Sequence, residues 1–190
     1  KLITLVRGKA AFKDAYTVVV TSSPVMSSEV ETSEYSADYI IIATGSVSAS
    51  LPIPGADLPG ILTSREILDL EEVPQRLCVI GGGVIGLEFA SVFRSFGSGV
   101  TVLEYFKEIL PRFDSDLSKR LKQSLGKRGI EINTQAQVTA IEEVPAVIST
   151  EGGDRVEKSI YKVSFTRKGK EEVVEADKVL MAVGRKANVG

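Results

Sequence analysis

The stretch CVIGGGVIGLE, residues 78–88, decides the fold of this 190-residue chain. An apolar run leads into consecutive glycines, and the segment after them is apolar at helical spacing. These apolar positions follow one another at intervals of four, three and four: Ile85, Phe89, Val92 and Phe96. The pattern predicts a strand over 76–80, a glycine turn, and a helix over 84–96 whose apolar stripe faces the core.

The glycines fit the pattern G-x-G-x-x-G, which is weak evidence alone but strong between a strand and a helix. Gly81 permits the tight turn, Gly83 lets the backbone approach a pyrophosphate, and Gly86 lets the helix pack closely. The free N–H groups at the helix start then face the phosphate charge. The predicted cofactor-binding residues of this turn are Gly81, Gly82, Gly83, Val84, Ile85 and Gly86.

Two carboxylates extend this site. Glu104 ends the next predicted strand, VTVLE, 18 residues after Gly86. A carboxylate there accepts hydrogen bonds from both ribose hydroxyls and repels a 2′-phosphate, which favours NAD over NADP. The alternative is an exposed charge at a strand end. Glu88 lies one turn into the helix, where it either matches the helix dipole or lies beside the nicotinamide ribose.

Composition excludes several classes of function. The net charge of −2 gives no basic surface for nucleic acid or anionic lipid. Apolar runs of about five residues fall short of the roughly 20 that span a bilayer. One cysteine and no histidine exclude a Cys/His pair, a Ser/His/Asp triad and a Cys/His zinc site. We therefore expect no catalytic residue, no metal, a core role for Cys78, and a reducing, cytoplasmic compartment.

Strands are also predicted before the glycine turn. Apolar segments at 3–12, 16–22 and 36–45 predict an antiparallel meander. The last of them is apolar at consecutive positions, which predicts a strand buried on both faces of a larger parallel sheet. A segment rich in proline and glycine at 51–75 is typical of a crossing between domains.

The fold class predicted from these patterns is α/β. We expect a Rossmann-like, mainly parallel sheet with helices on both faces, and a second helix over 115–128. An antiparallel hairpin over 159–176, turning at 168–170, interrupts the parallel order. The meander before residue 45 is expected to be incomplete.

The chain resembles the flavoprotein disulfide reductases over essentially its whole length. The resemblance is carried by the motifs quoted above, by IIIATGS at 40–46 and by MAVGRKANVG at 181–190. Within that family the likeness is greatest to the dihydrolipoamide dehydrogenases. Members carry an FAD fold, an NAD(P) fold inserted in it, and a dimerisation domain. The resemblance implies four parts: the end of an FAD-binding domain at 1–50, the crossing at 51–75, the NAD-binding domain at 76–184, and a return to the FAD domain at 185–190.

The resemblance also implies further contacts. Thr44 and Gly45 fall where the family's ATG turn meets FAD, and Gly8 falls where a backbone group meets the adenine of the flavin. Val138 matches a contact to the adenine of NAD, and Gly184 matches one near the nicotinamide. At Ala187 the chain departs from the proline common in the family.

Members of the family oxidise a dithiol to a disulfide and pass the electrons through FAD to NAD⁺. Their redox cysteine pair and histidine base fall outside this chain, so we expect a fragment that binds NAD(H) weakly, holds FAD poorly and is inactive alone. The parent is expected to be a homodimer that serves 2-oxoacid dehydrogenase or glycine cleavage components. The alternatives are a glutathione, mercuric or coenzyme A disulfide reductase, or a catalytically silent NAD-binding module.

Overall fold

The computed structural model describes residues 3–22, 31–149 and 155–189. The chain divides into two compact units, Lys1–Thr44 and Gly45–Gly190. Residues 45–50, grouped above with the N-terminal part, thus belong to the second unit. No helix in the described ranges has the length and apolar character needed to cross a membrane.

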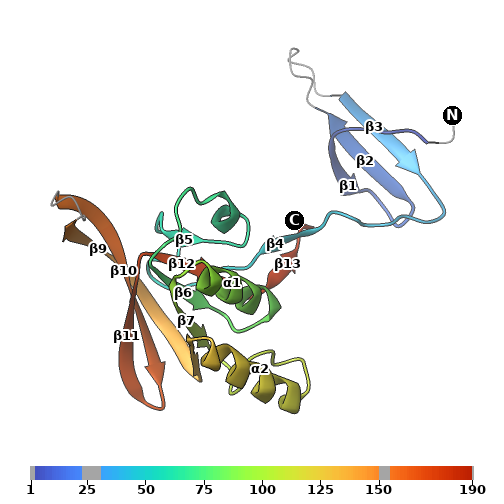
Figure 1. Cartoon of the computed structure of the whole chain (residues 1–190). Coiled ribbons are helices and arrows are strands. Elements are labelled where there is room, and N and C mark those ends of the chain that lie inside the picture. The colour runs from blue at the N-terminus through green and yellow to red at the C-terminus, as the bar shows by residue number, and fades with distance from the viewer. Residues whose placement is uncertain (1–2, 23–30, 150–154, 190) are drawn as a thin grey trace. The chain divides into compact units, whose positions relative to one another are not determined.

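The first unit is a three-stranded antiparallel sheet in the order β1-β2-β3 (Figure 1). Its strands are β1 (Lys9–Phe12), β2 (Thr17–Ser22) and β3 (Glu31–Ser36). The predicted antiparallel meander is confirmed for its first two strands, but its third strand is the polar segment ETSEYS at 31–36 and not the apolar segment at 36–45. All six residues of β3 are exposed, so β3 lacks the apolar alternation by which a strand is recognised in sequence.

The buried strand predicted at 36–45 is wrong. Ser36 ends β3, no residue of 37–45 has strand structure, and Tyr39 and Ile41 are 91% and 89% exposed. An apolar run of this kind forms a buried strand only where neighbouring strands accept its backbone hydrogen bonds. Among the described residues, no sheet includes this segment.

The second unit contains a five-stranded sheet in the order β5-β12-β6-β7-β8, with every neighbouring pair parallel (Figure 1). Its strands are β5 (Ile61–Leu62), β6 (Arg76–Ile80), β7 (Gly99–Glu104), β8 (Ile130–Thr134) and β12 (Lys178–Met181). The helices are α1 (Val84–Ser95), α2 (Ser115–Lys127) and a 3-10 turn, η1 (Glu66–Asp69). The predicted α/β class with a mainly parallel sheet is confirmed.

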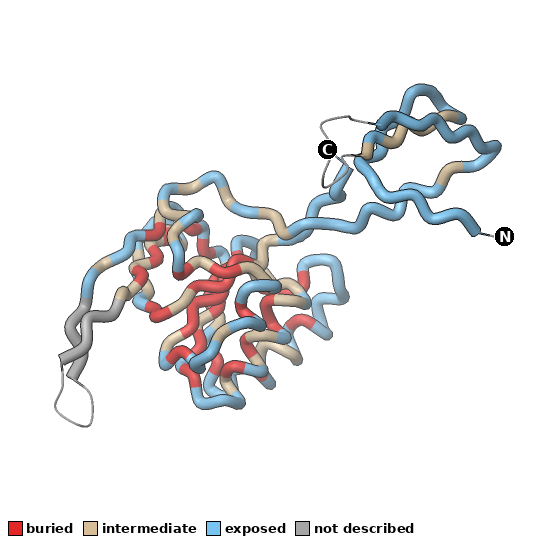
Figure 2. The backbone as a smooth tube through the Cα atoms, turned by 90° about the horizontal axis from the view of Figure 1, so that it is seen from above, coloured by how far each residue is buried: buried red, intermediate tan, exposed pale blue. Residues whose placement is uncertain are grey.

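The two faces of this sheet are covered differently. Leu77 and Val79 of β6 point into a core that contains the buried residues of α1 and α2. Cys78 and Ile80 point the other way, into a core shared with an antiparallel sheet. Figure 2 shows the buried residues, in red, gathered in the second unit. The antiparallel sheet has the order β11-β10-β9, from β9 (Ala136–Ser149), β10 (Arg155–Arg167) and β11 (Lys170–Ala176). The prediction of helices on both faces is therefore wrong, because strands cover one face.

Helix α1 faces the sheet with smaller residues than the pattern predicted. Its buried residues are Gly86, Leu87, Ala90 and Phe93. Val92 and Phe96, which we expected in the core, are 46% and 63% exposed. Gly86 and Ala90 on the inner face let the helix axis approach the strands closely, while Leu87 and Phe93 of the same face fill the core.

A two-stranded ribbon joins distant parts of the second unit. β4 (Ser46–Ser48) pairs antiparallel with β13 (Arg185–Ala187). Just beyond the ribbon, the N–H of Ala49 donates to the carbonyl of Gly184 at 2.9 Å. This pairing places the start of the crossing segment beside the end of β12.

Candidate functional site

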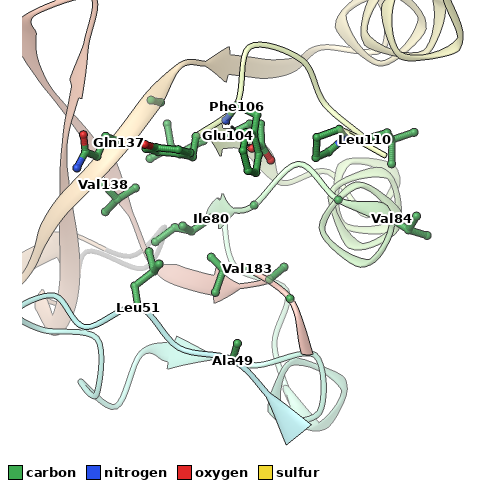
Figure 3. A pocket seen from close by; sticks show the side chains of 18 of the residues that line it. Ala49, Leu51, Ile80, Val84, Glu104, Phe106, Leu110, Gln137, Val138 and Val183 are labelled. Carbon is green, nitrogen blue, oxygen red and sulfur yellow. Dashed lines mark hydrogen bonds between the residues drawn. The ribbon is translucent and has the colours of Figure 1, made fainter. Parts of the chain in front are cut away.

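A cavity of about 790 Å³ opens at the carboxyl ends of the parallel strands β6, β7 and β12 (Figure 3). Its walls come from those strand ends, the start of α1, the loop after β7, the start of β9 and the segment 49–53. Open α/β sheets bind ligands at this edge, and pockets for small molecules have volumes of about 300–1,000 Å³. The cavity is large enough for a dinucleotide.

The glycine turn forms one wall and excludes side chains at two points. Gly81 has a φ of +112°, and a Cβ there would lie 2.4 Å from the carbonyl oxygen of Ala182. A Cβ on Gly86 would lie 2.1 Å from the carbonyl oxygen of Gly81. Gly83 is different, because it lines the cavity and a Cβ there would meet no atom within 4 Å.

The N-terminus of α1 faces the cavity at Val84. No side chain caps it, since Gly83 holds the cap position without a side-chain hydrogen bond. The first N–H groups of a helix have no partner within the helix. They are therefore open to an anionic ligand in the cavity.

Glu104 is the buried polar group of the site. It is 5% exposed, so the alternative of an exposed strand-end charge is wrong. Its Oε2 accepts the N–H of Gly82 at 2.5 Å, and its Oε1 accepts the N–H of Phe106 at 2.7 Å. A carboxylate oxygen has two lone pairs, so each oxygen can accept one more hydrogen bond. Glu104 also lines the cavity, where that capacity is available to a ligand.

The loop after β7 is fastened to its surroundings through the backbone. The N–H of Leu110 donates to the carbonyl of Gly82 at 2.9 Å, with Leu110 in the left-handed region at a φ of +50°. The N–H of Gln135 donates to the carbonyl of Phe106 at 2.9 Å. The loop contributes lining residues that the sequence did not predict: Tyr105, Phe106, Leu110, Pro111, Arg112 and Phe113.

The opposite end of the cavity is mostly apolar. Ala49, Leu51 and Val183 line it (Figure 3), and Ile53 of the crossing segment lines it too. Proline and glycine marked this segment as a crossing, and nothing local indicated a cavity wall. Arg185 also lines the cavity, and its Nε donates to Ser46 Oγ of the ribbon at 2.8 Å.

The predicted site residues fall into three groups. Those that line the cavity are Gly81, Gly83, Val84, Glu104, Val138 and Gly184. The second group belongs to the glycine turn or to the start of α1 but does not line the cavity: Gly82, Ile85, Gly86 and Glu88. Of these, Glu88 is exposed. Those assigned to FAD, which also do not line the cavity, are Gly8, Thr44 and Gly45. Gly8 packs tightly on β2, because a Cβ there would lie 2.6 Å from Val20 Cγ1.

Cys78 is fully buried, as expected for a core residue. Burial raises the pKa of its thiol to about 12, with a smaller contribution from Glu131. Nucleophilic cysteines have lowered pKa values and accessible sulfurs, so Cys78 is not a nucleophile. No group of three metal-ligating side chains occurs in the described part of the chain.

Comparison with known proteins identifies the family. The family model for pyridine nucleotide-disulphide oxidoreductases matches residues 2–190. The chain belongs to this family. It is 39% identical to the dihydrolipoyl dehydrogenase of Acholeplasma laidlawii over 153 residues, which are 78% of this chain and 40% of that protein. It is 34% identical to the mercuric reductase of Bacillus cereus over 182 residues, which are 96% of this chain and 25% of that protein.

Similarity to solved structures supports the same family assignment. The chain is similar to a copper(II) complex of the HOCl-induced flavoprotein disulfide reductase RclA from Escherichia coli, with a TM-score of 0.68 and 31% identity. The match covers 96% of this chain and 36% of that one. The relatives are oxidoreductases, and among them the dihydrolipoyl dehydrogenases confirm the predicted likeness. The chain spans two fifths or less of these relatives' lengths.

Proposed function

We propose that this chain binds NAD(H) as the NAD-binding part of a dihydrolipoamide dehydrogenase-like flavoprotein. In such an enzyme a dithiol is oxidised to a disulfide and the electrons pass through FAD to NAD⁺. The observation that carries the proposal is the position of Glu104. Its carboxylate is buried, held by two backbone N–H groups, and open to the cavity beside the glycine turn.

The residues of the cavity suit the parts of the coenzyme. The N–H groups at Gly83 and Val84 face the diphosphate, and the α1 dipole favours its negative charge. The two oxygens of Glu104 accept hydrogen bonds from the adenosine ribose hydroxyls. The apolar end at Ala49, Leu51 and Val183 surrounds the nicotinamide and excludes water.

The carboxylate also accounts for the choice of coenzyme. A 2′-phosphate would lie next to Glu104, whose position is fixed by its bonds to Gly82 and Phe106. Two negative charges at contact distance repel strongly where little water is present. We therefore expect NADH to bind more tightly than NADPH.

The other functional assignments are proposals that rest on family membership. FAD, when bound to the parent protein, supplies the path for electrons, and we propose that Gly8, Thr44 and Gly45 contact it. The predicted divisions at residues 50, 75 and 184 between FAD-binding and NAD-binding parts are proposed on the same basis. We also propose a cytoplasmic homodimer that serves 2-oxoacid dehydrogenase or glycine cleavage components.

Calorimetric titration of the chain with NADH and NADPH tests the proposal. We expect NADH to bind at least about tenfold more tightly than NADPH, a difference of about 1.4 kcal/mol. Glu104→Gln removes the negative charge and should bring the affinities for NADH and NADPH closer together. Glu171→Gln is the control, because Glu171 is exposed on β11 and does not line the cavity. Equal affinities for the two coenzymes, or no binding of either, would contradict the proposal.

A further inference from the structure

Two aromatic rings lie together on the cavity wall just after Glu104. Tyr105 and Phe106 pack edge to face, with ring centroids 5.4 Å apart and planes at 82°. Both line the cavity, and they are 63% and 54% exposed. Aromatic rings gain free energy when their faces are covered, so exposed rings in a cavity wall indicate a contact surface for a ligand.

The backbone of Phe106 is fixed on both sides. Its N–H donates to Glu104 Oε1 at 2.7 Å, and its carbonyl accepts the N–H of Gln135 at 2.9 Å. The backbone that carries the ring is therefore held beside the carboxylate before any ligand binds. Val138 of β9, which is buried, lines the cavity on the β9 side of Glu104 (Figure 3), and Ala136 of the same strand is also a buried lining residue.

We propose that Phe106 stacks on the adenine of the coenzyme, with Tyr105 bracing the ring edge-on. The inference rests on the proposed function and deepens it. If Glu104 holds the adenosine ribose, the base lies next to it, because base and 2′-hydroxyl are on adjacent carbons of the sugar. Phe106, two residues after Glu104, offers a flat apolar face there, and Val138 closes the slot.

Another exposed ring of the loop, Phe113, suits this role less well. Its N–H donates to the carbonyl of Leu110, and Leu110 is itself bonded to Gly82 of the glycine turn. Phe113 is thus joined to the glycine turn through Leu110, whereas the N–H of Phe106 donates directly to the carboxylate of Glu104. The ring attached to the ribose-binding carboxylate is Phe106.

Titration with two fragments of the coenzyme, only one of which contains adenine, tests the assignment. ADP-ribose carries the adenine and both phosphates, and reduced nicotinamide mononucleotide carries no adenine. Stacking of a base on an aromatic side chain contributes about tenfold or more to affinity. Phe106→Ala should therefore bind ADP-ribose about tenfold more weakly, whereas its affinity for the mononucleotide should stay unchanged.

Matched variants separate stacking from general damage. Phe106→Tyr keeps a ring and should keep the affinity for ADP-ribose, and Phe106→Leu keeps apolar volume without a ring and should lose most of it. Phe96→Ala is the control, because Phe96 is 63% exposed and does not line the cavity. Tyr105→Ala should weaken binding less than Phe106→Ala does.

The outcomes distinguish the inference from the proposal beneath it. If the unaltered chain binds neither ADP-ribose nor NADH, the proposed function fails. If it binds ADP-ribose and Phe106→Ala binds it equally well, only the stacking assignment fails. A larger loss of ADP-ribose affinity for Tyr105→Ala than for Phe106→Ala, or equal losses of affinity for ADP-ribose and the mononucleotide in Phe106→Ala, also overturns the assignment.

Discussion

Glu104 accepts the backbone N–H of Gly82 at 2.5 Å, across 22 residues of sequence. A Cβ on Gly82 would lie 2.9 Å from Glu104 Oε2 and 3.0 Å from Ile109 Cγ2, so the fit leaves no space for a side chain. The carboxylate that we assign to the ribose therefore also supports the glycine turn. Coenzyme choice and local stability depend on one side chain.

Replacing Glu104 should change both properties. Glu104→Ala removes the ribose acceptor and should lower NADH affinity by about 1–3 kcal/mol, with little loss for NADPH. It also leaves the N–H groups of Gly82 and Phe106 without their partner, which should lower the free energy of unfolding by about 1–3 kcal/mol. Titration with both coenzymes and urea denaturation measure the two effects. An unchanged NADH-to-NADPH ratio would show that the carboxylate does not select the coenzyme.

Gly83→Ala should separate binding from folding. Gly83 has a φ of −77° and a ψ of −178°, which alanine adopts without strain, and its Cβ would meet no atom within 4 Å. The free energy of unfolding should fall by no more than about 1 kcal/mol, because alanine is a poorer N-cap residue than glycine. NADH affinity should fall at least about tenfold, because the methyl group takes space needed by the diphosphate. Retained affinity in this variant would place the diphosphate elsewhere.

Gly86→Ala should act on folding itself. The added Cβ would lie 2.1 Å from the carbonyl oxygen of Gly81, so α1 must move outward. We expect a loss of about 1–3 kcal/mol in the free energy of unfolding. Gly126→Ala in α2 is the matched control, because no atom lies within 4 Å of the added Cβ. This substitution should raise the free energy of unfolding by about 0.5–1 kcal/mol, since alanine favours the helix more than glycine does. Equal effects of the two substitutions on urea denaturation would contradict this account of the turn.

Cys78 should respond to pH and to thiol reagents only through unfolding. Its pKa rises from 9.0 to about 12 in the folded chain, so the protonated thiol is favoured there. The corresponding stability is fully present below pH 9 and is lost as the pH rises from 9 toward 12. At pH 8 a disulfide reagent should label the chain in urea and leave the native chain unlabelled. Prompt labelling under native conditions would mean that the sulfur is accessible.

The parts of the fold that follow local periodicity could be predicted from sequence. The strand before Gly81, the helix that begins at Val84 and the hairpin turn at 168–169 are encoded by residues close in sequence. The glycine spacing also indicated that this edge of the sheet forms the site. These features depend little on distant contacts.

The rest depends on contacts that a single segment does not specify. The segment at 39–45 has the composition of a buried strand, but no described strand pairs with it. The inner face of α1 is set by Gly86 and Ala90, whose small size matters only against the sheet. The walls at 49–53 and 105–113 are brought to the cavity by the ribbon at Arg185 and by the bond from Leu110 to Gly82.

A crystal structure of the chain soaked with NAD⁺ tests the central claim most directly. We predict the diphosphate at the N–H groups of Gly83 and Val84, with the adenosine ribose hydroxyls on both oxygens of Glu104. A diphosphate bound away from the glycine turn, or a ribose that makes no contact with Glu104, would contradict it.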